Sequence, residues 1–141
     1  MVTIKARVWM PLLIGVFEVA AVGCATTGGA SRTIGPNDLP SLAGKWNGTL
    51  TLASGTSTQG TLDMAPSGDY TVQAAGFSAA GRAQVRDGNL TLVPSATSGG
   101  GTVGQRSSVA SLSERSDGML VLRGSGSSSS GPFNFEVMRP K

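Results

Sequence analysis

Apolar and polar residues alternate with a period of two from Gly44 almost to the end of the chain, and this pattern constrains the fold more than any other feature. In the segment 45–52, for example, Trp46, Leu50 and Leu52 share one parity while asparagine and threonine residues take the other. Such alternation predicts β-strands with one face in the core, because a helix would place apolar residues three and four apart. Six segments alternate clearly and two do so less cleanly: 45–52, 61–64, 70–74, 81–86, 89–92 and 133–137, then 106–114 and 119–123.

The breaks between these segments contain residues that favour turns. Asp87-Gly88 and Asp117-Gly118 fit tight type I′ hairpins, because glycine and often aspartate tolerate a positive φ. Longer glycine- and serine-rich breaks at 54–60, 97–104 and 124–131 indicate loops. Eight strands joined in chain order would leave two exposed edges in a flat sheet, and closure removes both. We therefore predict an all-β domain over residues 44–141, an eight-stranded antiparallel up-and-down barrel whose interior is filled or holds one small ligand.

Residues 1–23 are typical of an export signal. Lys5 and Arg7 give a positive start, and the apolar stretch from Val8 to Val22 is short for a bilayer span and contains Glu18. A permanent transmembrane anchor is therefore the weaker interpretation of this segment.

The apolar stretch ends in Ala21-Val22-Gly23-Cys24, which resembles the lipobox of bacterial lipoproteins. The resemblance implies that a diacylglycerol is attached to the sulfur of Cys24, that cleavage follows Gly23, and that the new amino terminus is acylated, typically with palmitate. It also implies a place in the bacterial cell envelope. Ala25 in place of an aspartate implies the outer membrane, facing the periplasm. The alternative is that Cys24 is a free thiol near a signal cleavage site.

Residues 24–43 are predicted to be a flexible tether. The run from Ala25 to Ser31 has no apolar periodicity, and Pro36 and Pro40 interrupt the rest of the segment. A coil of that length would hold the domain roughly 25 Å from the lipid.

Gly44-Lys45-Trp46 resembles the Gly-x-Trp motif that opens the first strand of the lipocalins and the wider calycin group. In those barrels the tryptophan closes one end and stacks beneath an arginine just past the last strand. Arg139 shares the parity of the apolar residues in segment 133–137, so we expect it to reach Trp46 through a cation–π contact of about 0.5–2 kcal/mol. The second lipocalin motif, Thr-Asp-Tyr, is absent, and the alternative is that Trp46 is an ordinary core residue.

Ser67-Gly68-Asp69-Tyr70 is similar to the Ser-Gly-x-x-Tyr motif of small lipoproteins that inhibit lysozyme, but it is one residue shorter. That resemblance implies a loop that inserts into a hydrolase. The simpler interpretation is a turn followed by Tyr70 as the first inward residue of the next strand.

The composition leaves little for catalysis. Histidine is absent and Cys24 is the only cysteine, which excludes Ser-His and Cys-His catalysis, most zinc sites and an internal disulfide. Without residues 1–23, the eleven basic and eight acidic side chains fall to nine and seven, and a net charge of +2 is too small to indicate nucleic acid. We expect no enzymatic activity, no metal, and no cofactor other than the covalent lipid on Cys24.

A candidate interface is indicated by the segment 119–122, which is apolar on both faces. If Leu120 and Leu122 fill the core, Met119 and Val121 point outward. Outward residues of the neighbouring strands would extend this row into an apolar patch. The predicted patch comprises Leu112, Met119, Val121 and Met138. The alternatives are that the tether covers this strand or that the register places Leu112 inside.

The sequence thus predicts a lipid-anchored envelope protein whose barrel is a non-enzymatic binding or structural module. A carrier of a small apolar ligand would contain a cavity, whereas a binder of an envelope protein or hydrolase would be filled and apolar outside. Small inward residues favour free space at one side of the interior; they are Ala74, Gly81, Ala83 and Ser111.

Overall fold

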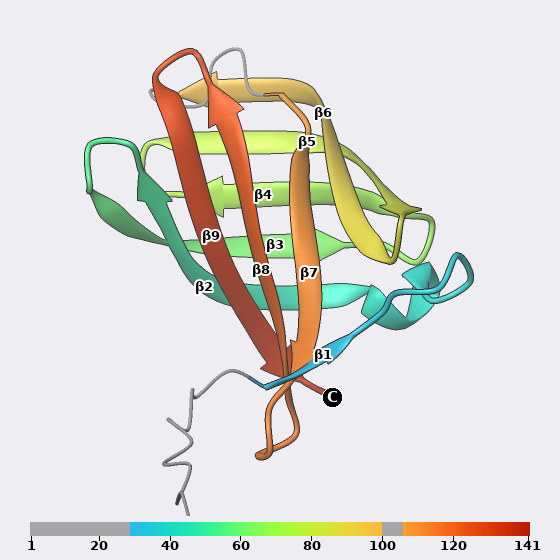
Figure 1. The fold of residues 1–141 in the computed structure, drawn as a ribbon. Helices are drawn as coiled ribbons and strands as arrows, with labels where there is room; N and C mark the ends of the chain where they lie inside the picture. Colours follow the sequence, from blue (N-terminus) through green and yellow to red (C-terminus); the bar gives the residue numbers. More distant parts are fainter. Residues whose placement is uncertain (1–28, 100–105) are drawn as a thin grey trace, which may run out of the picture.

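The computed structural model describes residues 29–99 and 106–141, and Figure 1 shows their course. This part of the chain forms nine β-strands and one short 3₁₀ helix. In chain order they are β1 (Ala30–Arg32), η1 (Leu39–Leu42), β2 (Gly44–Leu52), β3 (Ser57–Met64), β4 (Asp69–Ala74), β5 (Phe77–Arg86), β6 (Asn89–Gly99), β7 (Ser108–Glu114), β8 (Met119–Ser128) and β9 (Gly131–Pro140).

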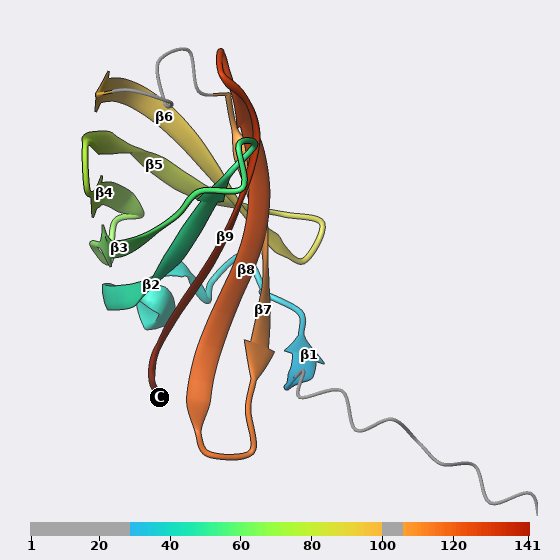
Figure 2. The ribbon, with the colours of Figure 1, turned by 90° about the vertical axis from the view of Figure 1, so that its left-hand side faces the viewer.

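Eight of these strands close into an antiparallel barrel. Each strand from β2 to β8 pairs with the next one along the chain, and β9 pairs back with β2. The closing register runs from Asn47 opposite Met138 to Leu52 opposite Phe133. Figure 2 shows the same strands from the side, curved around one interior. The predicted eight-stranded up-and-down barrel is confirmed, and its architecture is lipocalin-like.

Several strands are longer than the alternation predicts. β3 begins at Ser57, β8 continues to Ser128 and β9 begins at Gly131, so much of the loops expected at 54–60 and 124–131 is strand. Glycine has a low intrinsic preference for strands, but that preference is weak beside the pairing that neighbouring strands impose. The hairpins are therefore tighter than the composition indicates.

The two predicted type I′ hairpins differ from each other. Asp87 has a φ of 50° and Gly88 a φ of 76°, which fits the tight hairpin predicted between β5 and β6. Between β7 and β8 only Gly118 has a positive φ, of 81°. Here Arg115 N–H donates to the carbonyl oxygen of Met119 and Gly118 N–H donates to that of Arg115. This connection is a four-residue turn, so the type I′ prediction for it is wrong.

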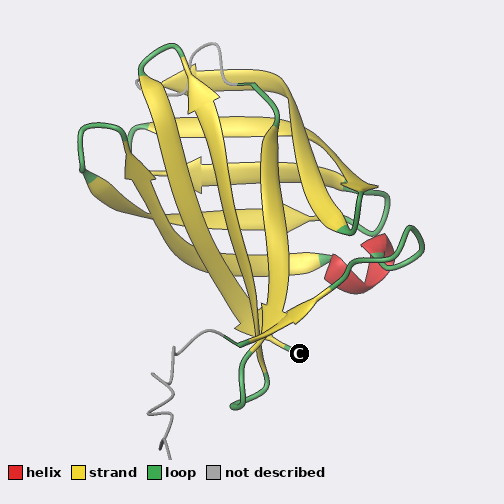
Figure 3. Ribbon diagram, in the orientation of Figure 1, coloured by secondary structure: helices red, strands yellow, loops and turns green. Residues whose placement is uncertain are grey.

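Residues 30–43 belong to the folded unit, although the sequence predicts a flexible tether over residues 24–43. β1 pairs with the end of β7, and Ile34 and Leu42 are each only 2% exposed. Figure 3 shows η1, the helical segment, at the end of the barrel where β2 begins. Isolated apolar residues produce no periodicity, so the sequence pattern does not reveal them as core residues. The folded domain therefore begins before Gly44.

The hydrophobic core occupies the barrel interior and receives inward residues from every barrel strand. One edge of β7 has two partners in succession: its first residues pair with β6, and its last residues pair with β1. The core is continuous with the end that η1 covers. It includes Ile34, Leu42, Trp46, Leu62, Met64, Tyr70, Ala83, Leu90, Leu92, Ala110, Leu112, Leu120, Leu122 and Val137.

Candidate functional site

Trp46 closes one end of the barrel, which we call the closed end. Its side chain is completely buried, at 0% exposure. The indole N–H donates a hydrogen bond of 3.0 Å to the carbonyl oxygen of Leu42. Because Leu42 is the last residue of η1, this bond fixes the short helix against the end of the barrel.

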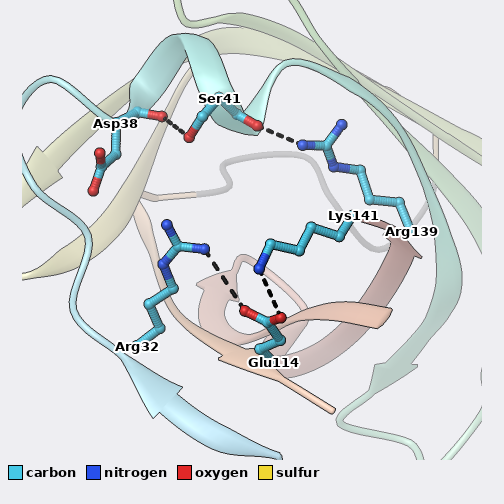
Figure 4. Close-up of polar contacts among 6 residues, drawn as sticks. All are labelled: Arg32, Asp38, Ser41, Glu114, Arg139 and Lys141. Carbon is cyan, nitrogen blue, oxygen red and sulfur yellow. Dashed lines mark hydrogen bonds and ion pairs between the residues drawn. The ribbon is translucent and has the colours of Figure 1, made fainter. Parts of the chain in front are cut away.

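Arg139 of β9 lies against the same ring. Its guanidinium carbon is 4.8 Å from the centre of the Trp46 ring. Nη1 donates to the carbonyl oxygen of Ala43 at 2.7 Å, and Nη2 donates to that of Ser41. Figure 4 shows the bond to Ser41. The structure therefore brings the two expected closure residues together, and the planar guanidinium stacks on the ring while it binds two carbonyl groups.

Gly44, the first residue of the Gly-x-Trp motif, has a physical reason to be glycine. Its φ is +123°, which side chains of L-residues rarely tolerate. A Cβ atom there would also lie 3.0 Å from Nη1 of Arg139. The motif therefore combines a closing aromatic ring with the space that its arginine needs.

Both ends of the described chain meet at the closed end. Glu114 of β7 accepts a hydrogen bond of 2.9 Å from Nζ of Lys141, and its other oxygen is 3.8 Å from Nη1 of Arg32 (Figure 4). Each such exposed ion pair contributes about 0–1 kcal/mol, so these contacts position the ends more than they stabilise them.

The other half of the barrel, which we call the cavity half, contains a cavity of about 50 Å³. Seven strands line it, and none of the lining residues is charged. A water molecule needs roughly 10–15 Å³ on this measure, and a drug-sized ligand needs about 300–1,000 Å³. The space therefore suits a small molecule or the tip of a longer one. Its large apolar side chains are Leu50, Leu62, Val72, Phe77, Leu92, Phe133, Phe135 and Val137.

Glycines in β8 make room for the aromatic rings of this half. Gly124 lies opposite Phe135, and Gly126 lies opposite Phe133. A Cβ atom at either glycine would overlap the ring of its partner. The rings therefore lie across the neighbouring strand, where they cover backbone that a side chain would otherwise occupy.

Tyr70 of β4 also lines the cavity, and its side chain is 3% exposed. Its hydroxyl group is buried and has no hydrogen-bond partner. Burial raises the pKa of Tyr70 to about 12, because the phenolate would lose its solvation. Tyr70 thus presents a neutral hydroxyl inside an apolar barrel.

Tyr70 does not belong to an exposed inhibitory loop. Ser67 and Gly68 form the turn between β3 and β4, as the simpler interpretation predicts. The Ser67 hydroxyl donates to the Asp69 carboxylate at 2.8 Å, and Nε of Arg82 is 3.3 Å from that group. The bond from Ser67 and then the charge of Arg82 lower the pKa of Asp69. The motif is a well-bonded turn whose tyrosine points inward.

The predicted outward apolar row is not formed. Leu112 is 3% exposed and packs in the core, together with Ala110, whereas Ser111 is exposed. The parity expected for this strand is therefore wrong, and the alternative register with Leu112 inside is confirmed. Val121 is only 1% exposed, and Met119 and Met138 are half-buried. Among the described large hydrophobic residues, Val109 alone is classed as exposed, at 50%.

The small residues expected to point inward have different surroundings. Ala74 lines the cavity, Gly81 lies beside the Tyr70 hydroxyl, and Ala83 is packed in the core. The sequence pattern does not identify Phe77 as an aromatic side chain of the cavity lining. It also does not show that the hydroxyl of Tyr70 lacks a hydrogen-bond partner. In the sequence, the signal for an aromatic lining is an aromatic residue that lies opposite a glycine of the adjacent strand. This signal can be recognised only when the register of the two strands is known.

Cys24 and the signal segment lie outside the described residues. Within residues 29–99 and 106–141, no helix has the length and apolar composition needed to cross a bilayer. In that same part of the chain, no three histidine, cysteine, aspartate or glutamate side chains gather where they could hold a metal ion.

Comparisons with protein-family models, with curated proteins and with solved structures found no match to this chain. The description of the fold as lipocalin-like accordingly comes from the barrel itself.

Proposed function

We propose that this protein is a membrane-anchored bacterial lipoprotein whose barrel binds a small, uncharged and largely apolar ligand, without catalysing a reaction. The observation that carries the proposal is the cavity, which is lined by residues of seven strands and by no charged side chain. An apolar lining of this kind favours a neutral occupant, because a charged group would lose its hydration without gaining a partner.

The exterior offers less support for a protein-binding module. Leu112 and Val121, two of the four residues of the predicted patch, are buried, and Tyr70 is inside the barrel instead of on an inserting loop. A ligand carrier is therefore favoured over an inhibitor of lysozyme or another hydrolase.

The anchor is proposed from the lipobox-like residues that end in Cys24. Ala30 begins β1 at the closed end, and a fully extended chain from Cys24 to Ala30 spans at most roughly 20 Å. The lipid would therefore hold the closed end near the bilayer of the outer membrane, with the cavity half facing the periplasm.

Ligand binding is tested with residues 25–141, which contain the whole described barrel, and with methylenecyclohexane as an apolar probe. We expect saturable binding by NMR titration, and we expect Ala79→Leu to abolish it because Ala79 lines the cavity. Ala80→Leu is the matched control, since Ala80 follows on the same strand and does not line the cavity. Ala74→Val serves as a second filling variant if Ala79→Leu fails to fold. Equal binding by all these variants would show that the probe lies elsewhere.

The anchor has its own test. Mass spectrometry of the mature protein should find an acylated Cys24 at the amino terminus, and Cys24→Ala should release the protein from membranes. Residues 1–23 still attached to the mature protein would exclude this part of the proposal.

A further inference from the structure

Tyr70 is the only tyrosine of the chain, and its hydroxyl is buried without a hydrogen-bond partner. Among the described residues, the other buried polar side-chain atom without a hydrogen-bond partner is Nε of Arg139. The rest of that guanidinium donates hydrogen bonds to backbone carbonyl groups and lies over the Trp46 ring. Leaving a buried hydroxyl unpaired is unfavourable, because the group loses the hydrogen bonds that it makes to water. An unpaired donor on a side chain that lines the cavity is therefore a feature that binding would correct.

The neighbouring strand is shaped to admit this side chain. Gly81 of β5 lies directly opposite Tyr70, and a Cβ atom there would lie 2.9 Å from the hydroxyl oxygen. The pairing of β5 with β6 shifts register between Ala80 and Gly81, where Pro94 lies opposite the glycine. A β-bulge of this kind changes where side chains point, and here it coincides with the place of the tyrosine hydroxyl.

The lining restricts what the hydroxyl can bind. None of the residues that line the cavity is charged, so an ionised carboxylate or phosphate would find no cation there. A neutral oxygen acceptor, in contrast, needs only one donor and fits an apolar surrounding.

We propose that Tyr70 is the recognition donor of the barrel and that its hydroxyl binds the carbonyl oxygen of a small neutral ligand, such as a ketone, an aldehyde or an ester. This inference rests on the proposed ligand-binding function and adds the chemical class of the ligand. The ligand's hydrocarbon part occupies the space beside Leu62, Val72 and Phe77, and its carbonyl group points toward β5.

The test compares two probes of the same shape that differ in the acceptor, cyclohexanone and methylenecyclohexane. Tyr70→Phe removes the hydroxyl and keeps the ring. We expect this variant to bind cyclohexanone about five- to tenfold more weakly than the wild type, as the loss of one buried hydrogen bond implies. Its affinity for methylenecyclohexane should change less than twofold. The infrared carbonyl stretch of bound cyclohexanone should lie at a lower frequency in the wild type than in Tyr70→Phe.

The outcomes separate the two proposals. If both probes bind and Tyr70→Phe affects them equally, the barrel binds ligands but Tyr70 does not recognise a carbonyl group. If neither probe binds the wild-type barrel, the proposed function fails for ligands of this size, and the inference fails with it. If the hydroxyl only holds a water molecule, cyclohexanone binds without a change in its carbonyl stretch, which also overturns the inference.

Discussion

The ring of Phe135 lies across Gly124 of the adjacent strand, in the position that a side chain at Gly124 would occupy. We therefore expect Gly124→Ala to destabilise the barrel by about 1–3 kcal/mol, because the methyl group forces the ring out of its place. Urea unfolding followed by circular dichroism measures this loss. In a Phe135→Leu background the same substitution should have a smaller effect, since the two positions are coupled through one contact. Equal losses in both backgrounds would show that the ring is not the cause.

Trp46→Ala should lower the free energy of unfolding by about 3–5 kcal/mol, the usual result of deleting a buried large aromatic side chain. The ring is fully buried, and the hydrogen bond to Leu42 is lost as well. Denaturant unfolding provides the measurement. A loss below about 1 kcal/mol would contradict the role of Trp46 in closing the barrel.

Arg139→Lys should destabilise the barrel by about 1–3 kcal/mol although the charge is kept. A lysine ammonium cannot stack flat on Trp46 while it binds two carbonyl oxygens, as the guanidinium does. Arg82→Lys is the matched control, because Arg82 is exposed and pairs only at the surface with Asp69. Thermal and urea unfolding should show a clear loss for Arg139→Lys and no measurable change for Arg82→Lys. Similar values for the two variants would contradict this prediction.

The titration of Tyr70 gives a direct readout of its environment. Its pKa is raised from 10.0 to about 12, so the folded protein retains a proton that the unfolded chain releases. The stability that this shift contributes is complete below pH 10 and is lost as the pH rises from 10 to 12. Because Tyr70 is the only tyrosine, the phenolate absorbance of the native protein reports on it alone. Tyr70→Phe should remove this part of the pH dependence without lowering stability at neutral pH, and a native titration near pH 10 would contradict the burial of the hydroxyl.

Val121→Glu should destabilise the barrel by about 3–5 kcal/mol, because it places an unpaired carboxylate at a site that is 1% exposed. Val109→Glu is the control, since Val109 lies on the adjacent strand and is 50% exposed. Near-native stability is expected for that variant by thermal unfolding. If both variants were equally stable, Val121 would be a surface residue, as the predicted patch requires.

The sequence pattern was sufficient for the barrel, because alternation determines which residues of a strand share a face. The contact of Trp46 with Arg139 was predicted from the resemblance to the lipocalin motif, and the parity of Arg139 agreed with it. Parity failed in β7, where serine and alanine residues surround one leucine and the exposed Val109 looks like a core residue. A strand with so few large side chains does not specify its own inward face.

The cavity and its donor were harder to predict for a different reason. Tyr70 was correctly expected to point inward, but the state of its hydroxyl depends on every neighbour within hydrogen-bond distance. Likewise, Ile34 becomes a core residue because it fills the end of a barrel that other residues build. Such properties arise from the packing between strands and not from the local pattern along one of them.

The pairing of β2 with β9 has a consequence for how the protein is made. The first and last strands of the barrel are neighbours, so the contact that completes the fold is also the most distant along the chain. During synthesis every strand up to β8 can find its sequential partner, but the growing sheet keeps two unpaired edges until β9 emerges. Arg139, near the end of that strand, can reach Trp46 only after the ribosome has made β9. The barrel therefore cannot close before β9 has been made, and products truncated before β9 should aggregate.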